Sequence, residues 1–192
     1  MTTHWGNESV YVGGLTHAER LEGWRALLTG DWRAAATDGA ALANVTVGNT
    51  FNRNVKFWSF ADSSKKRITI GDGAPFILLP QGTKTARLRF MWGQRGTTAS
   101  DRTVRWLFQA IQTEDSDQII NATDADIRDV GVYLTGTEPD RYAYKVDDMD
   151  LTLTSWDNRP TMFTFGRNGD AGSSTDTCTD AALVYGLQLF VK

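Results

Sequence analysis

The sequence predicts an all-β protein: a jelly-roll-like antiparallel β-sandwich that follows an N-terminal arm with one short helix. The first supporting observation is a series of short runs rich in β-branched and aromatic residues from residue 45 onward, separated by Gly, Pro, Asn and Asp. The second is that no helical pattern is long enough to connect parallel strands. The 192 residues, 41% of them apolar, suffice for one domain with a real core. We therefore expect an arm over residues 1–44 and a sandwich over residues 45–192.

The expected helix begins with a capping box. Thr16 stands three residues before Glu19, the spacing at which the two side chains satisfy each other's backbone N–H groups. Apolar residues then follow at helical spacing, at Leu21, Trp24, Leu27 and Leu28. Together these features predict a helix over residues 17–28, which Gly23 weakens and Gly30 ends.

Eleven β-like segments follow, from which we expect roughly eight to ten short strands. They cover residues 44–48, 55–60, 67–70, 76–79, 85–92, 103–111, 130–134, 142–146, 151–156, 161–165 and 183–191. Pro80 and Gly82 suit a type II turn with glycine at positive φ. We expect a loop or short helix over residues 112–129 and a loop over residues 166–180.

Residues 83–111 predict two strands joined by a loop, with arginines on the face opposite the core. Side chains alternate between the faces of a strand, which gives the two strands a common core set of Leu88, Phe90, Trp92, Val104, Trp106, Phe108 and Ala110. Arg87, Arg89 and Arg105 then mark the outer face. Arginine beside Met or Leu suits a face that touches a subunit, a partner or an acidic segment of the same chain, such as residues 114–117.

Seven tryptophans are many for this length, and several lie where a β-sandwich offers little core. Four aromatic residues precede the β body and are candidate interface residues together with the three arginines: Trp5, Tyr11, Trp24 and Trp32. By parity Trp156 lies opposite Leu151 and Leu153, so it is expected to be exposed. An exposed ring on a sandwich can stack on a sugar or anchor an interface. Trp156, Tyr142 and Tyr144 are therefore candidate sugar-stacking residues.

No catalytic, cofactor-binding or metal-binding residue is predicted. The chain has two histidines and one cysteine, Cys178, too few for a zinc site, and no phosphate-binding glycine loop. The acidic segments 121–129 and 147–150 lack the pattern of a calcium loop, so we interpret them as solvated turn carboxylates.

Charge and hydropathy limit the expected partners. The net charge of −3 argues against nucleic acid, and no apolar stretch approaches the length of a membrane helix. No signal peptide is visible, which predicts synthesis in the host cytoplasm. Residues 1–111 carry a net charge of +6 and residues 112–192 a net charge of −9, an asymmetry that can steer head-to-tail association.

The chain as a whole resembles the virion structural proteins of tailed bacteriophages, in particular capsid decoration ("cement") proteins. The resemblance lies in a cysteine-poor β-sandwich, an aromatic N-terminal arm, Gly/Thr/Asp-rich loops and a last strand that runs to Lys192. It is one of pattern and transfers no individual residue. It implies a virion subunit, often a homotrimer, that clamps neighbouring major capsid proteins without doing chemistry, with the arm as the shell contact. The start HWGNESVYVGG is also similar to that of some phage tail-tube proteins.

Three hypotheses about function follow. The first is a non-enzymatic decoration protein or another virion component, such as a tail protein. The second is a carbohydrate-binding sandwich, which the exposed aromatic residues would serve. The third is a β-sandwich hydrolase, supported only by dispersed carboxylates, whose separation is spatial and not visible in a sequence.

Overall fold

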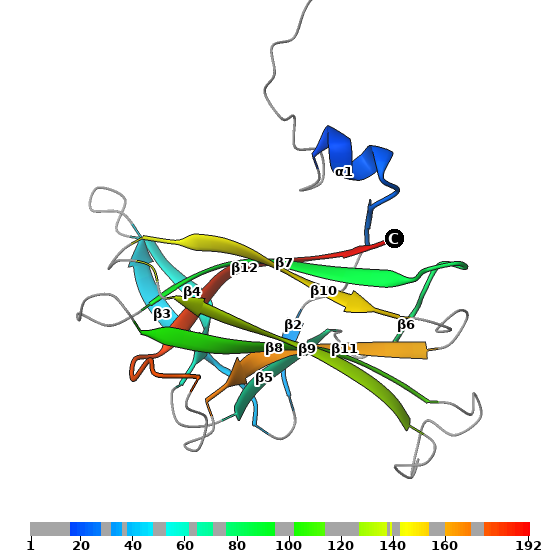
Figure 1. Cartoon of the computed structure of the whole chain (residues 1–192). Helices are drawn as coiled ribbons and strands as arrows, with labels where there is room; N and C mark the ends of the chain where they lie inside the picture. Colours follow the sequence, from blue (N-terminus) through cyan, green and yellow to red (C-terminus); the bar gives the residue numbers. More distant parts are fainter. Residues whose placement is uncertain are drawn as a thin grey trace, which may run out of the picture.

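The computed structural model describes residues 16–27, 32–35, 38–47, 53–61, 65–70, 76–94, 102–113, 127–137, 139, 143–153, 160–169 and 175–192. Over these residues the protein is almost entirely β-strand, with one short helix, α1 (His17–Leu21). Two antiparallel sheets lie face to face, and α1 lies on the outer side of one of them (Figure 1). The predicted all-β sandwich with one short helix is confirmed.

The first sheet, sheet I, has the strand order β10-β7-β12-β4-β3, with β1 beside β12. Its strands are β1 (Arg25–Ala26), β3 (Ala41–Val47), β4 (Arg53–Phe60), β7 (Thr85–Gln94), β10 (Lys145–Thr152) and β12 (Ala182–Val191). Sheet II has the order β2-β5-β11-β8-β9, with β6 beside β11. Its strands are β2 (Trp32–Ala34), β5 (Lys65–Ile70), β6 (Phe76–Leu78), β8 (Thr103–Thr113), β9 (Ile127–Thr137) and β11 (Pro160–Asn168). Only the connections β3–β4, β5–β6 and β8–β9 join neighbours in chain order within one sheet, and every other connection between the strands that the structure describes changes sheet, which makes the sandwich jelly-roll-like.

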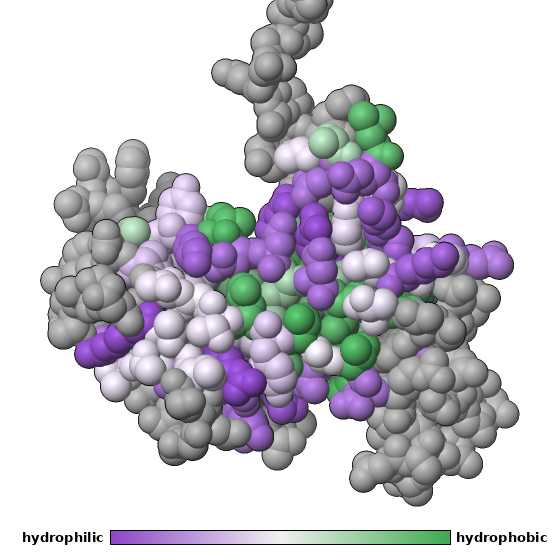
Figure 2. Space-filling view, viewed as in Figure 1, coloured by the Kyte–Doolittle hydropathy of each residue, from purple (hydrophilic) through white to green (hydrophobic). Residues whose placement is uncertain are grey.

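The core lies between the inner faces of the two sheets, and aromatic rings dominate its centre. Trp106 of β8 has ring centroids of Phe60, Phe90, Trp92 and Phe165 within 5.1–5.5 Å of its own. All the predicted core residues of β7 and β8 are buried, which confirms the face assignment made from alternation. Figure 2 shows hydrophobic residues gathered between more polar layers.

A buried ion pair fastens the segment before β12 to the core. Arg167 of β11 and Asp176 have side chains that are 0% and 2% exposed, and Arg167 Nε and Nη2 donate to the two Asp176 oxygens at 2.9 and 2.7 Å. Arg167 also donates to the backbone carbonyls of Asp180, Phe60 and Cys178. The predicted loop over 166–180 is therefore wrong in its first part, because β11 continues to Asn168 and buries an arginine there.

The helix is shorter than the predicted span of 17–28. Gly23 adopts φ +92°, and the N–H groups of Gly23 and Trp24 donate to the carbonyls of Arg20 and Glu19 at 3.0 and 3.1 Å. This is a Schellman ending, which glycine favours because it has no Cβ. The chain then enters β1, so Trp24 lies outside the helix. Just after β1, the Leu27 N–H donates to the Leu189 carbonyl of β12.

Residues 83–111 also differ from their prediction in one respect. The two strands exist, as β7 and β8, but they belong to different sheets and do not pair with each other. Arg105 therefore lies on the outer face of sheet II, away from Arg87 and Arg89. The division at residues 44 and 45 stays a prediction, although β1, β2 and the start of β3 already pair with strands of both sheets.

Candidate functional site

Part of the outer face of sheet I carries a charged cluster, here called the clamp, made of Arg87, Arg89, Asp148, Asp150 and Glu19. The register of β7 and β10 sets Arg87 opposite Asp150 and Arg89 opposite Asp148. Arg87 Nε and Nη2 donate to Asp150 at 2.6 and 2.7 Å, and Arg89 Nε and Nη2 donate to Asp148 at 2.8 Å each. Both pairs are bidentate, the geometry that guanidinium and carboxylate groups match best.

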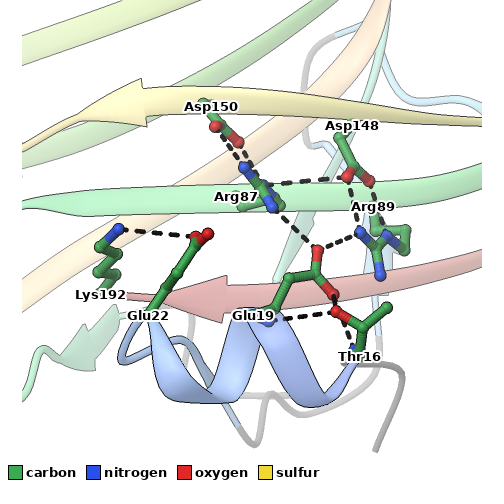
Figure 3. Close-up of polar contacts among 8 residues, drawn as sticks. All are labelled: Thr16, Glu19, Glu22, Arg87, Arg89, Asp148, Asp150 and Lys192. Atoms are coloured by element: carbon green, nitrogen blue, oxygen red, sulfur yellow. Dashed lines mark hydrogen bonds and ion pairs between the residues drawn. The ribbon is translucent and has the colours of Figure 1, made fainter. Parts of the chain in front are cut away.

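Helix α1 supplies the third carboxylate of the clamp. Glu19 Oε1 accepts hydrogen bonds from Arg87 Nη1 at 3.0 Å and Arg89 Nη2 at 2.7 Å (Figure 3). Its other oxygen accepts from the Thr16 backbone N–H at 2.8 Å, and Thr16 Oγ1 accepts from the Glu19 N–H, so the predicted capping box is present. One glutamate thus both caps the helix and attaches it to two strand arginines.

Hydrogen bonding sets the charge of this glutamate. The bond from Arg89 is the main cause that lowers the pKa of Glu19 from 4.5 to about 2. The hydrogen bonds to Asp150 and Asp148 in turn raise the pKa values of Arg87 and Arg89. The Glu19 side chain is 15% exposed and stays ionised at neutral pH. Helix α1 is therefore held by charge-assisted bonds at any pH well above 2.

Aromatic rings support the clamp from the side of β12. The Arg87 guanidinium carbon lies 4.3 Å from the ring centroid of Trp24, which is 5% exposed and packs on Phe190. Lys192 Nζ lies 5.5 Å from the same Trp24 ring. A helix of five residues is not stable alone. Its attachment therefore depends on Glu19 from one side and on Trp24, just after the helix, from the other.

The rest of the outer face of sheet I, here called the aromatic half, presents Phe57, Met91, Tyr144, Val146 and Tyr185. Tyr144 and Val146 are 66% and 51% exposed, and the rings of Phe57 and Tyr185 meet edge to face with centroids 4.9 Å apart. Burial raises the pKa of the Tyr185 hydroxyl. Exposed and half-buried rings on one face form a surface suited to stacking.

Gly93 of β7 leaves room for the ring of Tyr185. A Cβ at position 93 would lie 2.6 Å from the Tyr185 hydroxyl oxygen and 2.8 Å from the Ala143 carbonyl oxygen. Any other residue would therefore displace Tyr185 or the backbone before β10. The tyrosine itself stands at a register shift of β12, between Val184 and Gly186. The bulge and the glycine together position this side chain.

Two hollows border the aromatic half. The first, of about 470 Å³, lies where β12 separates from β4, since the two strands pair only through Ala182–Val184. Its aromatic lining consists of Trp32, Phe57, Trp58 and Tyr185. The second, of about 480 Å³, is lined by Arg89, Val146, Asp147 and Asp148. Both volumes fall within the range of small-ligand sites.

The predicted site residues are distributed over several places. Arg87 and Arg89 lie on an outer face as expected, and the acidic groups that pair with them come from β10 and α1 of the same chain. The acidic residues 114–117 lie outside the described residues. Arg105 Cζ lies 4.1 Å from the ring centroid of Tyr133 on sheet II. Trp24 is buried beside the clamp, Trp32 lines the first hollow and Tyr144 is exposed. The remaining candidates lie outside the described residues: Trp5, Tyr11, Tyr142 and Trp156.

Several residues of the site were missed from sequence. Asp148 and Asp150 were interpreted as solvated turn carboxylates, but they lie on a strand and pair with arginines. A signal was present, because Arg-x-Arg at 87–89 and Asp-x-Asp at 148–150 repeat opposite charges with the period of a strand. Nothing comparable marked Phe57 or Tyr185, whose neighbourhood depends on the separation of β12 from β4.

Among the described residues, no group of three or more His, Cys, Asp or Glu side chains is arranged to hold a metal ion. No helix in this part of the chain is long and apolar enough to cross a membrane.

Comparison with known proteins assigns no family. No protein-family model and no curated protein matches the chain. Among solved structures, the chain is similar to a family 16 carbohydrate-binding module. The alignment covers 79% of this chain and 86% of the module, at 13% identity and a TM-score of 0.43. The alignment with the xylan-binding CBM22-1 domain from Paenibacillus barcinonensis covers 88% of this chain and 92% of that domain, at 7% identity and a TM-score of 0.43. The alignment with the enzymatically active domain of tailspike protein 4 from bacteriophage CBA120 covers 96% of this chain and 21% of the tailspike chain, at 10% identity and a TM-score of 0.40. At these values the likenesses carry no function over to the chain.

Proposed function

We propose that the protein is a non-enzymatic structural component of a tailed-bacteriophage virion, a decoration or cement protein that binds the assembled capsid. The observation that carries this proposal is the clamp. It attaches α1, which the first residues of the predicted arm precede in the chain, to a fixed point on sheet I. Those first residues include the predicted contact residues Trp5 and Tyr11.

A fixed attachment point favours binding through the arm. A chain whose root is already held loses less conformational freedom when its tip is captured, so more of the contact energy appears as affinity. Binding only to the assembled shell would stabilise that shell by mass action. In a homotrimer, three such arms would add their weak contacts through avidity.

The chemistry of the clamp supports a non-enzymatic role. Its three carboxylates all bind guanidinium groups, and the pKa of Glu19 is held at about 2. A carboxyl with so low a pKa carries no proton to donate at neutral pH, which makes it a poor general acid. These residues fit a structural attachment better than hydrolysis.

The test is co-sedimentation of the purified protein with empty capsids of the phage that encodes it. We expect saturable binding by the wild type and loss of binding by a variant that lacks residues 1–15. A control with Arg105→Ala on the opposite sheet should bind like the wild type. Binding to tails in place of capsids would select the tail-protein alternative, and equal capsid binding by the truncated variant would contradict the role of the arm.

Light scattering tests the proposed trimer separately. A solution mass three times that of the chain is expected. A clean monomer at micromolar concentration would contradict the avidity part of the proposal.

A second candidate function is carbohydrate binding. One observation favours it: Phe57, Tyr144 and Tyr185 present their rings on the same face of sheet I, next to hollows of small-ligand size. Such a role is compatible with a virion subunit, since the clamp and the rings of the aromatic half occupy adjacent parts of the face and meet at Arg89 and Asp148.

A further inference from the structure

We infer that the aromatic half of the outer face of sheet I binds an extended, neutral oligosaccharide, with pyranose rings on Tyr185 and Tyr144 and hydroxyl groups hydrogen-bonded at Asp148. This inference rests on the second candidate function and names its site and ligand class. It differs from the sequence-based prediction in two of three residues, since it replaces Tyr142 and Trp156 by Tyr185 and Phe57.

The arrangement of the rings fits a chain of sugars better than a single one. Tyr144 precedes β10, Tyr185 belongs to β12 and Phe57 to β4, so the rings lie on strands at positions one, three and four of sheet I. Three interstrand spacings correspond to about 14 Å across the sheet. The C–H faces of pyranose rings are apolar and stack on aromatic rings, so a linear oligosaccharide could lie across the strands and contact more than one ring.

One glycine keeps the floor of this track low, and another lets a ring lie over it. A Cβ at Gly186 of β12 would meet nothing within 4 Å, whereas the space above Gly93 of β7 is occupied by Tyr185. Open space above the strand backbone allows a flat ligand to approach closely, as glycine permits elsewhere in proteins. The first hollow lies at one end of the track and adds Trp32 and Trp58, which pack against the edge of the core, to the rings of Phe57 and Tyr185.

Polar groups lie at the other end of the track. The second hollow is lined by Asp147, Asp148, Arg89 and Val146. The Asp148 side chain is 32% exposed on the outer face, and its carboxylate has more acceptor positions than its two bonds to Arg89 use. Asp147 points to the core side of the strand, where it accepts a hydrogen bond from Trp92 Nε1. A planar carboxylate beside aromatic rings supplies the directional acceptors that sugar hydroxyls need. The negative charge of Asp148 disfavours acidic sugars, which is why the inferred ligand is neutral.

The size of the site favours a glycan over a protein. A stable protein interface covers roughly 800 Å² on each partner. The hollows of about 470 and 480 Å³ have the volume of small-ligand sites; the first has mostly apolar walls, and the second is lined by three charged residues and Val146. A second copy of the chain remains the competing occupant in the test.

The test is isothermal titration calorimetry of the full chain with cellohexaose, xylohexaose and maltohexaose, three neutral linear probes. We expect at least one probe to bind, and Tyr144→Ala and Tyr185→Ala each to weaken that binding at least tenfold. Tyr185→Phe keeps the ring and should retain most of the affinity. The matched control is Tyr133→Ala, which removes a 51% exposed tyrosine from sheet II and should change nothing. Gly93→Ala should weaken binding without removing any ring, because its Cβ would displace Tyr185.

The possible failures are distinguishable. If no probe binds the wild type, both the carbohydrate function and this site are overturned. If a probe binds and all aromatic-half variants retain wild-type affinity, carbohydrate binding stands and this site is overturned. If Tyr144→Ala, whose exposed side chain contributes little to folding, changes the solution mass measured by light scattering, a second copy occupies the face and the inference is overturned. Circular dichroism of each variant confirms that it is folded.

Discussion

The two arginine clusters use the same chemistry for different purposes, and burial accounts for the difference. Arg167 and Asp176 lie between the sheets with side chains 0% and 2% exposed, and they fasten the segment before β12 to the core. Arg87 and Arg89 lie on the outer face of sheet I with side chains 19% exposed, and they attach α1. A buried charge that loses its partner is stabilised neither by an opposite charge nor by water, whereas a surface charge that loses its partner is hydrated. Loss of the first cluster is therefore expected to destabilise the whole fold, and loss of the second to detach α1 while the sandwich stays folded.

The largest effect is expected at the buried pair. Asp176→Ala leaves the Arg167 guanidinium buried without its carboxylate, which should lower the free energy of unfolding by about 3–5 kcal/mol. Urea denaturation followed by tryptophan fluorescence measures this value. A loss below 1 kcal/mol would show that the two clusters do not differ as described.

The next effect is expected at the clamp. Arg89→Glu places a third carboxylate between Asp148 and Glu19, so α1 should detach while the sandwich stays folded. We expect a loss of stability of about 2 kcal/mol, smaller than at Asp176 because the charges can reach water. Hydrogen exchange should show loss of protection at the amides of Glu22, Gly23 and Trp24. Unchanged protection there would contradict the attachment through Arg89.

A smaller, pH-dependent effect is expected at Glu19. Its folded pKa of about 2 lies below the ordinary value of 4.5, so its stabilising contribution is complete above pH 4.5 and is lost as the pH falls toward 2. Glu19→Gln should cost about 1 kcal/mol at pH 7, and its difference from the wild type should shrink between pH 4.5 and 2. Thermal unfolding across this range measures the difference. The matched control is Glu22→Gln just after the helix, whose side chain is 61% exposed and which should cost little stability at pH 7.

The smallest effect is expected on sheet II. Arg105→Ala removes a surface cation–π contact with Tyr133, which is worth about 0.5–1 kcal/mol. Hydrogen exchange at the amides of α1 should stay unchanged. Urea denaturation should give an unfolding free energy within about 1 kcal/mol of the wild type, which would show that the Arg167 pair is unaffected. A larger loss would mean that this arginine also has an attaching role.

Local periodicity predicted the fold well. Alternation placed Leu88, Phe90 and Trp106 in the core, and the Thr16–Glu19 spacing located the start of α1. Alternation could not tell that β7 and β8 belong to different sheets, because each sheet has a core face and an outer face with the same pattern. The end of the helix was misplaced because apolar spacing continues past Gly23, where the backbone already turns.

The candidate site was less predictable because it depends on long-range register. The arginines were visible in the sequence, but their partners on β10 lie some 60 residues further along the chain, and the pairing follows from strand order. Arg167 stood at the start of an expected loop, so nothing local marked it as buried. Tyr185 acquires its neighbours only through the bulge in β12 and the absent side chain of Gly93.

The most direct test of the central claim, that the clamp holds the arm for contact with a capsid, compares two charge reversals. Arg89→Glu breaks the clamp, and Arg105→Glu makes the same change of charge on the opposite sheet. The affinity of each variant for empty capsids of the parent phage is measured by co-sedimentation. The account predicts at least a tenfold loss for Arg89→Glu and wild-type affinity for Arg105→Glu. Equal affinities for the two variants would contradict it.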